Sequence, residues 1–321
     1  MRLGLVTWTA AFWAAVPPLA QEPFLTLPLD CELGKTCYIE DYVDVDPGEG
    51  VRDFACGLKT RNGHRGTDFA LVSQADFTRG IHVIASAPGL VEATRDGMAD
   101  VPYTAETAAA IKGRECGNAV RVRHANGLQT LYCHLAQGSV RVNKGDTVGR
   151  GDVLGTVGMS GQSNYPHVHV SVLGPDGNID PFDPKGGEEC GVGAQPLWQA
   201  PLPYSSTGMF TAGFSDRVPS FDDVKSGAAR VSETGRDAPL VLYSHFYYAQ
   251  DGDVLHLTAS GPDGEVFDKH EQLEAPKVNQ YRAYGRKAPN GGWPTGEYSG
   301  RAVLERGGEV LAVRFTRVTI P

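Results

Sequence analysis

The chain has 321 residues, of which 41% are hydrophobic and 21% charged, and its formal net charge is −9. At about 100–200 residues per domain this length indicates two domains, and the composition excludes disorder of the whole chain. Asp and Glu (38) outnumber Lys and Arg (29), which disfavours nucleic acid as a partner because phosphate binding needs clustered cations. The 40 glycines and 21 prolines favour frequent turns and therefore short strands.

The first twenty residues are typical of a secretory signal. Arg2 supplies a positive charge, the run from Leu3 to Val16 is almost wholly apolar, and Ala20 precedes a polar stretch. A membrane anchor is the alternative, but this run is shorter than the about 20 residues that span a bilayer. We therefore expect a signal peptide over residues 1–20, a periplasmic or secreted protein, and no stable membrane insertion.

The six cysteines all lie in the first 190 residues, at Cys31, Cys37, Cys56, Cys116, Cys133 and Cys190. An exported protein meets oxidising conditions, so an even number of cysteines predicts three disulfides. A cysteine-rich zinc site would need short CxxC pairs, which the sequence lacks. Cys31 and Cys37 could close a small loop, and the other four allow three pairings, between which the sequence does not choose. A link between Cys116 and Cys133 is the pairing we favour.

The first half reads as a series of short strands. Residues 120–124 and 128–132 alternate apolar and polar side chains around an Ala125-Asn126-Gly127 turn, which predicts a β-hairpin. Further strands are expected at 140–142 and 153–157, and only residues 105–112 resemble a helix. This half is predicted to be a β-rich domain over residues 21–184, including an N-terminal extension.

A Gly/Pro-rich interruption over residues 185–205 reads as a linker. Beyond it, residues 240–242, 254–258 and 309–315 are strand-like and are bounded by turn sequences such as Asp251-Gly252. This spacing predicts a small β-sandwich over residues 206–321. Its likeness to an immunoglobulin-type module is one of fold only.

Histidines mark three places in the first half: His64 with Asp68, then His134, then the pair His167 and His169. The last two alternate with valines, so in a strand both rings project from one face, about 6.6 Å apart along it. A single zinc ion is not easily reached by both rings, so one could bind a metal while the other stays free. His82, His124, His245, His256 and His270 read as ordinary surface or core residues.

His64 and Asp68 would lie about 13 Å apart in a flat strand, but Gly66 between them allows a bend. A His–Asp–His set that leaves a fourth position open is typical of catalytic rather than structural zinc. A serine hydrolase is the competing enzyme class, because residues 158–162 read Gly-Met-Ser-Gly-Gln. That reading fails, since the GxSxG pattern needs glycine where Gln162 stands.

The following runs together resemble the lysostaphin/LytM-type zinc metallopeptidases, which cut peptide bonds in bacterial peptidoglycan: His64-x-x-x-Asp68, Tyr132-Cys133-His134-Leu135, residues 158–163 and Pro166-His167-Val168-His169. Residues 87–91, 117–120 and 144–148 fall in the family's order, so the resemblance covers about residues 60–184. It implies an all-β fold, in which a split-barrel-like peptidase domain, built as a duplicated hybrid motif, is followed by the small β-sandwich. It also implies Zn²⁺ ligands at His64, Asp68 and His169 and a catalytic pair at His134 and His167.

The resemblance implies a secreted zinc metalloendopeptidase that acts on peptidoglycan peptide stems. A secretory signal without a visible wall-anchoring motif suggests a Gram-negative periplasm, so the expected bond is the link between D-alanine and diaminopimelate rather than a pentaglycine bridge. The alternative is a catalytically inactive wall-binding module that activates an amidase. All five site residues are present, which favours the enzyme. The stretch from Thr94 to Cys116 is longer than a minimal family member needs, so one edge of the groove is expected to be unusual.

Overall fold

The computed structural model describes residues 23–71, 74–186, 190–191, 195–274 and 277–321. The expected signal peptide over residues 1–20 lies outside the described residues. Within the described part, no helix is long and apolar enough to cross a membrane. Nearly all regular structure is β-strand, so the predicted all-β fold is confirmed.

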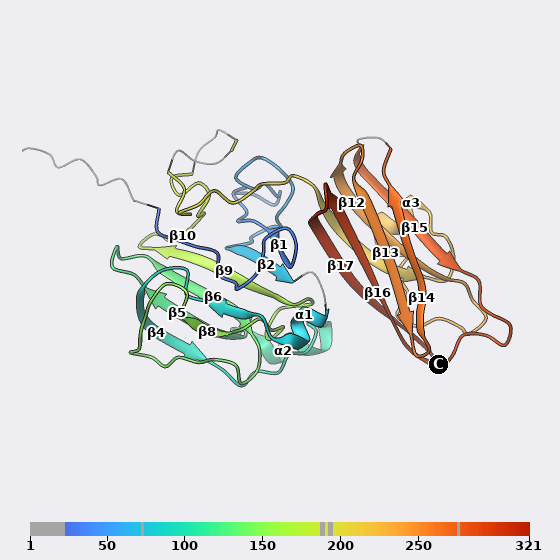
Figure 1. Cartoon of the computed structure of the whole chain (residues 1–321), viewed down its shortest axis with the longest axis horizontal. Coiled ribbons are helices and arrows are strands. Elements are labelled where there is room, and N and C mark those ends of the chain that lie inside the picture. Colours follow the sequence, from blue (N-terminus) through green and yellow to red (C-terminus); the bar gives the residue numbers. More distant parts are fainter. Residues whose placement is uncertain (1–22, 72–73, 187–189, 192–194, 275–276) are drawn as a thin grey trace, which may run out of the picture.

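The first half is built on one large antiparallel sheet (Figure 1). Its strands run in the spatial order β1 (Cys37–Asp41), β2 (Thr67–Leu71), β9 (His167–Gly174), β6 (Gln129–Leu135), β5 (Asn118–Arg123), β4 (Gly89–Arg95) and β7 (Thr147–Val148), with β10 (Gly177–Ile179) paired to β9. A smaller sheet pairs β3 (His82–Ile84) with β8 (Val153–Thr156), and two short helices, α1 (Gln74–Arg79) and α2 (Ala105–Ile111), lie between strands. The valines of β9 that alternate with its histidines are buried in the core.

The predicted hairpin is confirmed as β5 and β6, with Arg121 opposite Leu131. The helix expected over residues 105–112 is confirmed as α2. The strand expected at 140–142 is wrong. There, Val140 N–H donates to the Asp96 carboxylate and Arg141 N–H to the Leu154 carbonyl, so no strand ladder forms.

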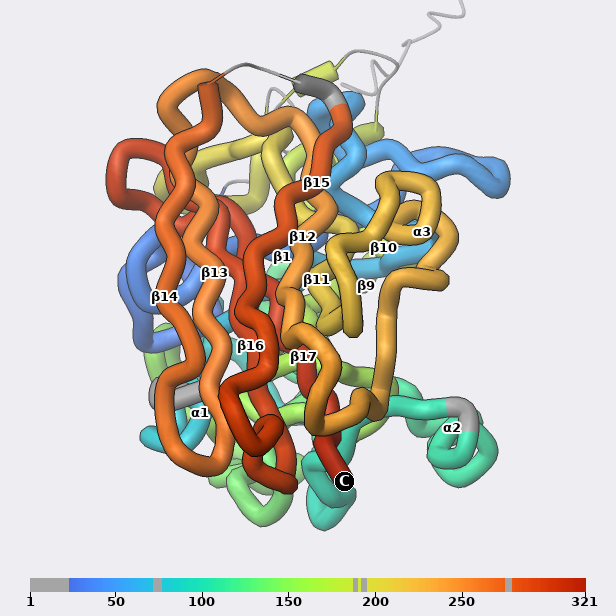
Figure 2. The backbone as a smooth tube through the Cα atoms, turned by 90° about the vertical axis from the view of Figure 1, so that its right-hand side faces the viewer, coloured from blue at the N-terminus to red at the C-terminus, as the bar shows by residue number. Residues whose placement is uncertain are grey.

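The second half is a two-layer β-sandwich, as predicted. One sheet has the order β11 (Gly208–Ser215), β12 (Leu240–Ala249) and β15 (Lys277–Arg286); the other has β14 (Gly264–Gln272), β13 (Val254–Gly261), β16 (Gly296–Arg306) and β17 (Glu309–Ile320). Figure 2 shows β14, β13 and β16 side by side. A third short helix, α3 (Phe221–Ser226), precedes β12; neither α3 nor α1 was expected from the sequence.

The sandwich packs against the edge of the large sheet of the first half, where β17 lies along β1 (Figure 1). Tyr38 Oη donates to the Val313 carbonyl at 3.1 Å, and Lys59 Nζ donates to the Leu311 carbonyl at 3.0 Å. Glu40 and Arg314 form an ion pair across the same contact. The two halves therefore share an interface that contains buried charges.

Three disulfides are present, as the even cysteine count predicts: Cys31–Cys37, Cys56–Cys190 and the favoured Cys116–Cys133. Within the segment read as a linker, Cys190 is bonded to the first domain, and Leu197 and Trp198 are buried in its core. Part of this segment therefore packs on the first domain. The domain boundaries drawn from the sequence stay a prediction.

Candidate functional site

Strands β2 and β9 bring together residues that lie about a hundred positions apart in the chain. Asp68 stands directly opposite His169 in their register, and His64 lies in the loop that leads into β2. Asp68 Oδ1 lies 2.7 Å from His169 Nδ1 and 3.1 Å from His64 Nε2, and the two nitrogens are 3.0 Å apart. The three expected ligand atoms therefore converge on one point, which could hold a metal ion.

Gly66 is what lets this loop approach β9. A Cβ at this position would lie 2.6 Å from His169 Nε2 and 2.7 Å from the Val170 carbonyl oxygen, closer than real contacts allow. The sequence predicted a bend at Gly66, and the physical need is this close approach of backbone to ring. Any larger residue would displace the imidazole of His169.

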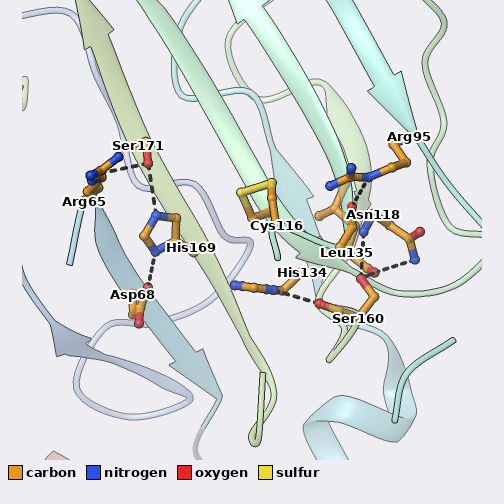
Figure 3. The surroundings of a disulfide bond; sticks show 12 residues. Arg65, Asp68, Arg95, Cys116, Asn118, His134, Leu135, Ser160, His169 and Ser171 are labelled. Atoms are coloured by element: carbon orange, nitrogen blue, oxygen red, sulfur yellow. Dashed lines mark hydrogen bonds and ion pairs between the residues drawn. A yellow bond between two sulfur atoms is a disulfide. The ribbon is translucent and has the colours of Figure 1, made fainter. Parts of the chain in front are cut away.

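Hydrogen bonds on the far side of each ring select the tautomer that a metal site needs. His64 Nδ1 lies 2.6 Å from the Tyr42 carbonyl, so it carries the proton and leaves the Nε2 lone pair free. Ser171 donates its hydroxyl to the Arg65 carbonyl and accepts from His169 Nε2 at 3.0 Å, which leaves the His169 Nδ1 lone pair free (Figure 3). Two lone pairs and a carboxylate oxygen facing one another repel unless a cation lies between them. The donor set thus fits a metal ion.

The second oxygen of Asp68 is held by residues that the sequence analysis did not identify. Arg61 Nη1 lies 2.9 Å from Asp68 Oδ2, and Tyr165 Oη donates to the same oxygen at 3.2 Å. Burial by itself raises the pKa of Asp68, but the charge of Arg61, and that of His64 when this ring is protonated, lower it well below the usual 3.8. The carboxylate is therefore ionised and oriented. Neither residue belongs to the quoted motifs, so only the fold could reveal them.

Burial also lowers the pKa of His64, yet attraction to the Asp68 carboxylate raises it above 6.5 overall. The same attraction that favours a proton at this point favours a metal cation. The electrostatics and the geometry of the site agree.

His134 and His167 lie beside the three ligand atoms. Their ring centroids are 4.7 Å apart, and His167 Nε2 is 3.7 Å from Asp68 Oδ2. His134 Nδ1 donates to the Ser160 carbonyl at 2.7 Å and His167 Nδ1 to the Tyr165 carbonyl at 2.9 Å, so each neutral ring keeps Nε2 as an acceptor. Burial lowers the pKa of both rings. His167 Nε2 is buried without a hydrogen-bond partner among the described residues, as expected of a group whose partner is a bound substrate or water.

The Cys116–Cys133 disulfide adjoins His134 (Figure 3). His134 N–H donates to the Cys116 carbonyl at 2.9 Å, and His134 has a φ of +63°, a left-handed conformation that is unfavourable for a histidine. Tertiary contacts must hold such a backbone in place. The disulfide and the Cys116 carbonyl are two of these restraints.

A cavity of about 750 Å³ opens beside His64 and Arg65. It is walled by residues 43–48 of the N-terminal extension and by residues 177–180 and 183–186 beyond β9. A cleft of this size can accommodate a peptide-sized ligand.

Of the other histidines, none in the first half joins the site: His82 lies on β3, and His124 is hydrogen-bonded to Pro88 and Thr130.

The segment that carries the site is similar in sequence to a known peptidase family. Residues 62–181 match the sequence profile of "Peptidase family M23". DD-carboxypeptidase/endopeptidase Mpg of Neisseria meningitidis is 37% identical over 119 residues, and peptidoglycan DD-endopeptidase ShyA of Vibrio cholerae is 33% identical over 110 residues. These matches cover 35% and 34% of this chain and 20% of each relative. The chain therefore spans about a fifth of the length of these two relatives.

Similar proteins among the solved structures include two catalytic domains. The catalytic domain of the prophage-encoded M23 protein EnpA from Enterococcus faecalis is 24% identical, with 52% of this chain and 99% of that chain covered and a TM-score of 0.34. The catalytic domain of lysostaphin from Staphylococcus simulans is 20% identical, with 44% and 85% covered and a TM-score of 0.29. The family assignment rests on the sequence profile and the curated relatives.

Proposed function

Because residues 62–181 are a domain of peptidase family M23, we propose that this protein is a zinc metalloendopeptidase that hydrolyses peptide cross-links of bacterial peptidoglycan. The bond we propose joins D-alanine to diaminopimelate, in keeping with the DD-endopeptidase names of the two relatives. The observation that carries the proposal is the convergence of His64 Nε2, Asp68 Oδ1 and His169 Nδ1, in the tautomers a metal requires, next to His134 and His167.

His64, Asp68 and His169 would hold the ion, and three protein ligands leave a position open for substrate or water. Zinc bound there would supply Lewis acidity toward the scissile carbonyl and lower the pKa of a water ligand. Tyr42 and Ser171 fix the orientation of the two ligand rings. Such outer hydrogen bonds raise ligand basicity and affinity.

His134 and His167 provide the proton transfer. Each Nε2 is an acceptor in the neutral ring and can take a proton from the attacking water. Once protonated, the same Nε2 can donate to the leaving amine or to the developing oxyanion. The cavity, which His64 alone of the five site residues lines, would receive a part of the peptide stem away from the scissile bond.

The three disulfides support a location outside the cytoplasm, since disulfides persist in oxidising compartments. We propose the periplasm or the extracellular space, reached through the signal peptide predicted over residues 1–20. Peptidoglycan peptide stems would be encountered there.

The first experiment identifies the bond. The full chain is incubated with purified peptidoglycan rich in links between D-alanine and diaminopimelate, and the products are analysed by mass spectrometry. We expect cross-linked dimers to become monomers by addition of one water at that bond. Cleavage only at another bond would contradict the proposed specificity. A chain that binds zinc and peptidoglycan but cleaves nothing would support the alternative of an inactive binding module.

The second experiment tests the roles by measuring zinc stoichiometry and hydrolysis together. His64→Ala, Asp68→Ala and His169→Ala should lose zinc at this site and activity, because each removes one of three protein ligands. His134→Ala and His167→Ala should keep the metal while turnover falls about 10²–10⁴-fold. His82→Ala, an exposed histidine on β3, is the matched control and should change neither quantity. If all five variants kept zinc and activity, the site would lie elsewhere.

A further inference from the structure

A second His–Asp–His cluster lies in the β-sandwich. Besides the site at His64, Asp68 and His169, the described residues contain one more group of potential metal ligands: His256, Asp268 and His270. His256 Nε2 lies 2.8 Å and His270 Nε2 3.3 Å from the same oxygen, Asp268 Oδ1. The sequence analysis assigned both histidines to ordinary surface or core positions, because a lone histidine at an alternating strand position is usually one.

The cluster is produced by strand register. His256 on β13 is directly opposite His270 on β14, and Asp268 precedes His270 by two residues, so all three side chains lie on one face of the sheet. The residues that flank His256, Leu255 and Leu257, point into the sandwich core. Two paired strands on a packed core therefore hold the three ligands in place before any ion binds.

The distances from the carboxylate oxygen to the two ring nitrogens resemble those of the peptidase site. There, the carboxylate oxygen lies 2.7 and 3.1 Å from the two ring nitrogens; here, the same distances are 2.8 and 3.3 Å. Tetrahedral zinc with bonds of about 2.0–2.2 Å places its ligand atoms about 3.3 Å from one another. The distances between the carboxylate oxygen and the ring nitrogens suit such a shell, and rotation of the two imidazole rings about their side-chain bonds would bring both Nε2 lone pairs onto one ion.

The two imidazole rings stack, with centroids 3.7 Å apart and planes inclined by 18°. A metal ion binds imidazole in the plane of the ring, through the lone pair of a ring nitrogen, so the two rings must turn out of this stack to reach one ion. The side chains are 16%, 40% and 60% exposed for His256, Asp268 and His270, which gives an ion a path from solvent. Exposure also leaves coordination positions open to water or a further ligand.

We propose that His256, Asp268 and His270 form a second metal site, selective for Zn²⁺ or a similar divalent transition-metal ion. The donor set of two imidazoles and one carboxylate suits such ions better than Mg²⁺ or Ca²⁺, which prefer oxygen ligands. The bound ion cross-links β14, the edge strand of its sheet, to the central strand β13. The expected role is stabilisation of the sandwich.

The location connects the site with the interface between the two halves of the chain. Val313, Val303, His256 and His270 form one continuous row across β17, β16, β13 and β14. Val303 and Val313 are buried in a cluster that includes Tyr38 from the first half. The metal would therefore sit on the face of the sandwich that turns toward the peptidase domain.

The test counts zinc ions bound to the purified full chain by equilibrium dialysis and elemental analysis. We expect two ions per wild-type chain and one in each of His256→Ala, His270→Ala and Asp268→Asn. His169→Ala should also hold one, and His169→Ala combined with His256→Ala should hold none. Glu265→Gln, an exposed change on β14 away from the cluster, is the matched control and should hold two.

Thermal unfolding gives a readout that does not depend on catalysis. Added Zn²⁺ should raise the Tm of the His169→Ala chain and should not raise that of the double variant. If His169→Ala binds no zinc and shows no shift, the cluster is only hydrogen-bonded and this inference is wrong, while the proposed peptidase function stands. A second ion that survives His256→Ala and His270→Ala would also overturn it. Failure of the proposed function would instead appear as hydrolysis that is unaffected by His169→Ala.

Discussion

Replacing Arg314 by Met tests how the sandwich is joined to the first domain. Arg314 pairs with Glu40, which is only 4% exposed and whose Oε2 has no hydrogen-bond partner among the described residues. Burial raises the pKa of Glu40, and the Arg314 cation opposes that rise. The variant would leave a buried carboxylate without its cation, and breaking such a pair destabilises a protein by about 3–5 kcal/mol.

The loss should depend on pH. Without Arg314, the pKa of Glu40 in the folded chain rises further above its unfolded value, so the carboxyl takes up a proton instead of remaining an unpaired charge. A folded-state pKa above the unfolded one means that stability is highest below the unfolded pKa and falls as pH rises through the folded one. We therefore expect the full destabilisation at pH 8 and a much smaller one at pH 4.

The assay is urea unfolding followed by tryptophan fluorescence at both pH values. Glu40→Gln combined with Arg314→Met removes both charges and should recover most of the stability lost in the single variant at pH 8. Arg317 lies on β17, as Arg314 does, and forms an exposed pair with Glu297 on β16; Arg317→Met should cost less than about 1 kcal/mol. The reasoning is refuted if Arg314→Met costs no more than this control, or if its cost is the same at pH 4 and pH 8.

Three further predictions concern the site and its supports. Gly66→Ala would place a Cβ 2.6 Å from His169 Nε2, so zinc affinity and hydrolysis should fall about tenfold or more. Gly235→Ala, which has open space around it, is the control and should change neither quantity. A normal zinc affinity in Gly66→Ala would count against the steric argument. Tyr165→Phe removes the hydroxyl that donates to the proposed carboxylate ligand, and zinc affinity measured by dialysis should weaken about 10–100-fold, an unchanged affinity being the contrary result. Burial raises the pKa of Asp180 from 3.8 to about 7. Between these pH values the unfolded chain therefore binds fewer protons than the folded chain. The free energy of unfolding should accordingly fall by up to about 4 kcal/mol from pH 4 to pH 7. Asp180→Asn should remove that slope in denaturant unfolding, and persistence of the slope would assign it to other groups.

Local pattern was sufficient for what depends on neighbouring residues. The alternation of His167 and His169 with buried valines predicts a strand with both rings on one face, and β9 has this form. The Ala125-Asn126-Gly127 turn and its flanking alternation predict the β5–β6 hairpin for the same reason. An even cysteine count indicated disulfides, and the hairpin itself brings Cys133 near Cys116. Val140–Val142 shows the limit, because short alternation does not guarantee a partner strand.

Contacts across the fold were beyond the sequence because they depend on register and on packing between distant segments. Arg61 and Tyr165 reach Asp68 only because β2 pairs with β9 and the preceding loop folds over them. His256 and His270 became a cluster only through the pairing of β13 with β14, since a shift of one residue would turn one ring to the opposite face.

The sequence by itself determined the kinds of chemistry present in this protein: the histidines and the aspartate, their order, and the strands that carry them. The tertiary structure decided which of these groups meet, which nitrogen of each ring is free, and that the sandwich rests on β1 through buried charges. The physical reason is the distance along the chain over which each kind of interaction acts. Side-chain period and turn preference act over a few residues, whereas a ligand distance of 2.7 Å between residues 101 positions apart is the product of the whole packed sheet.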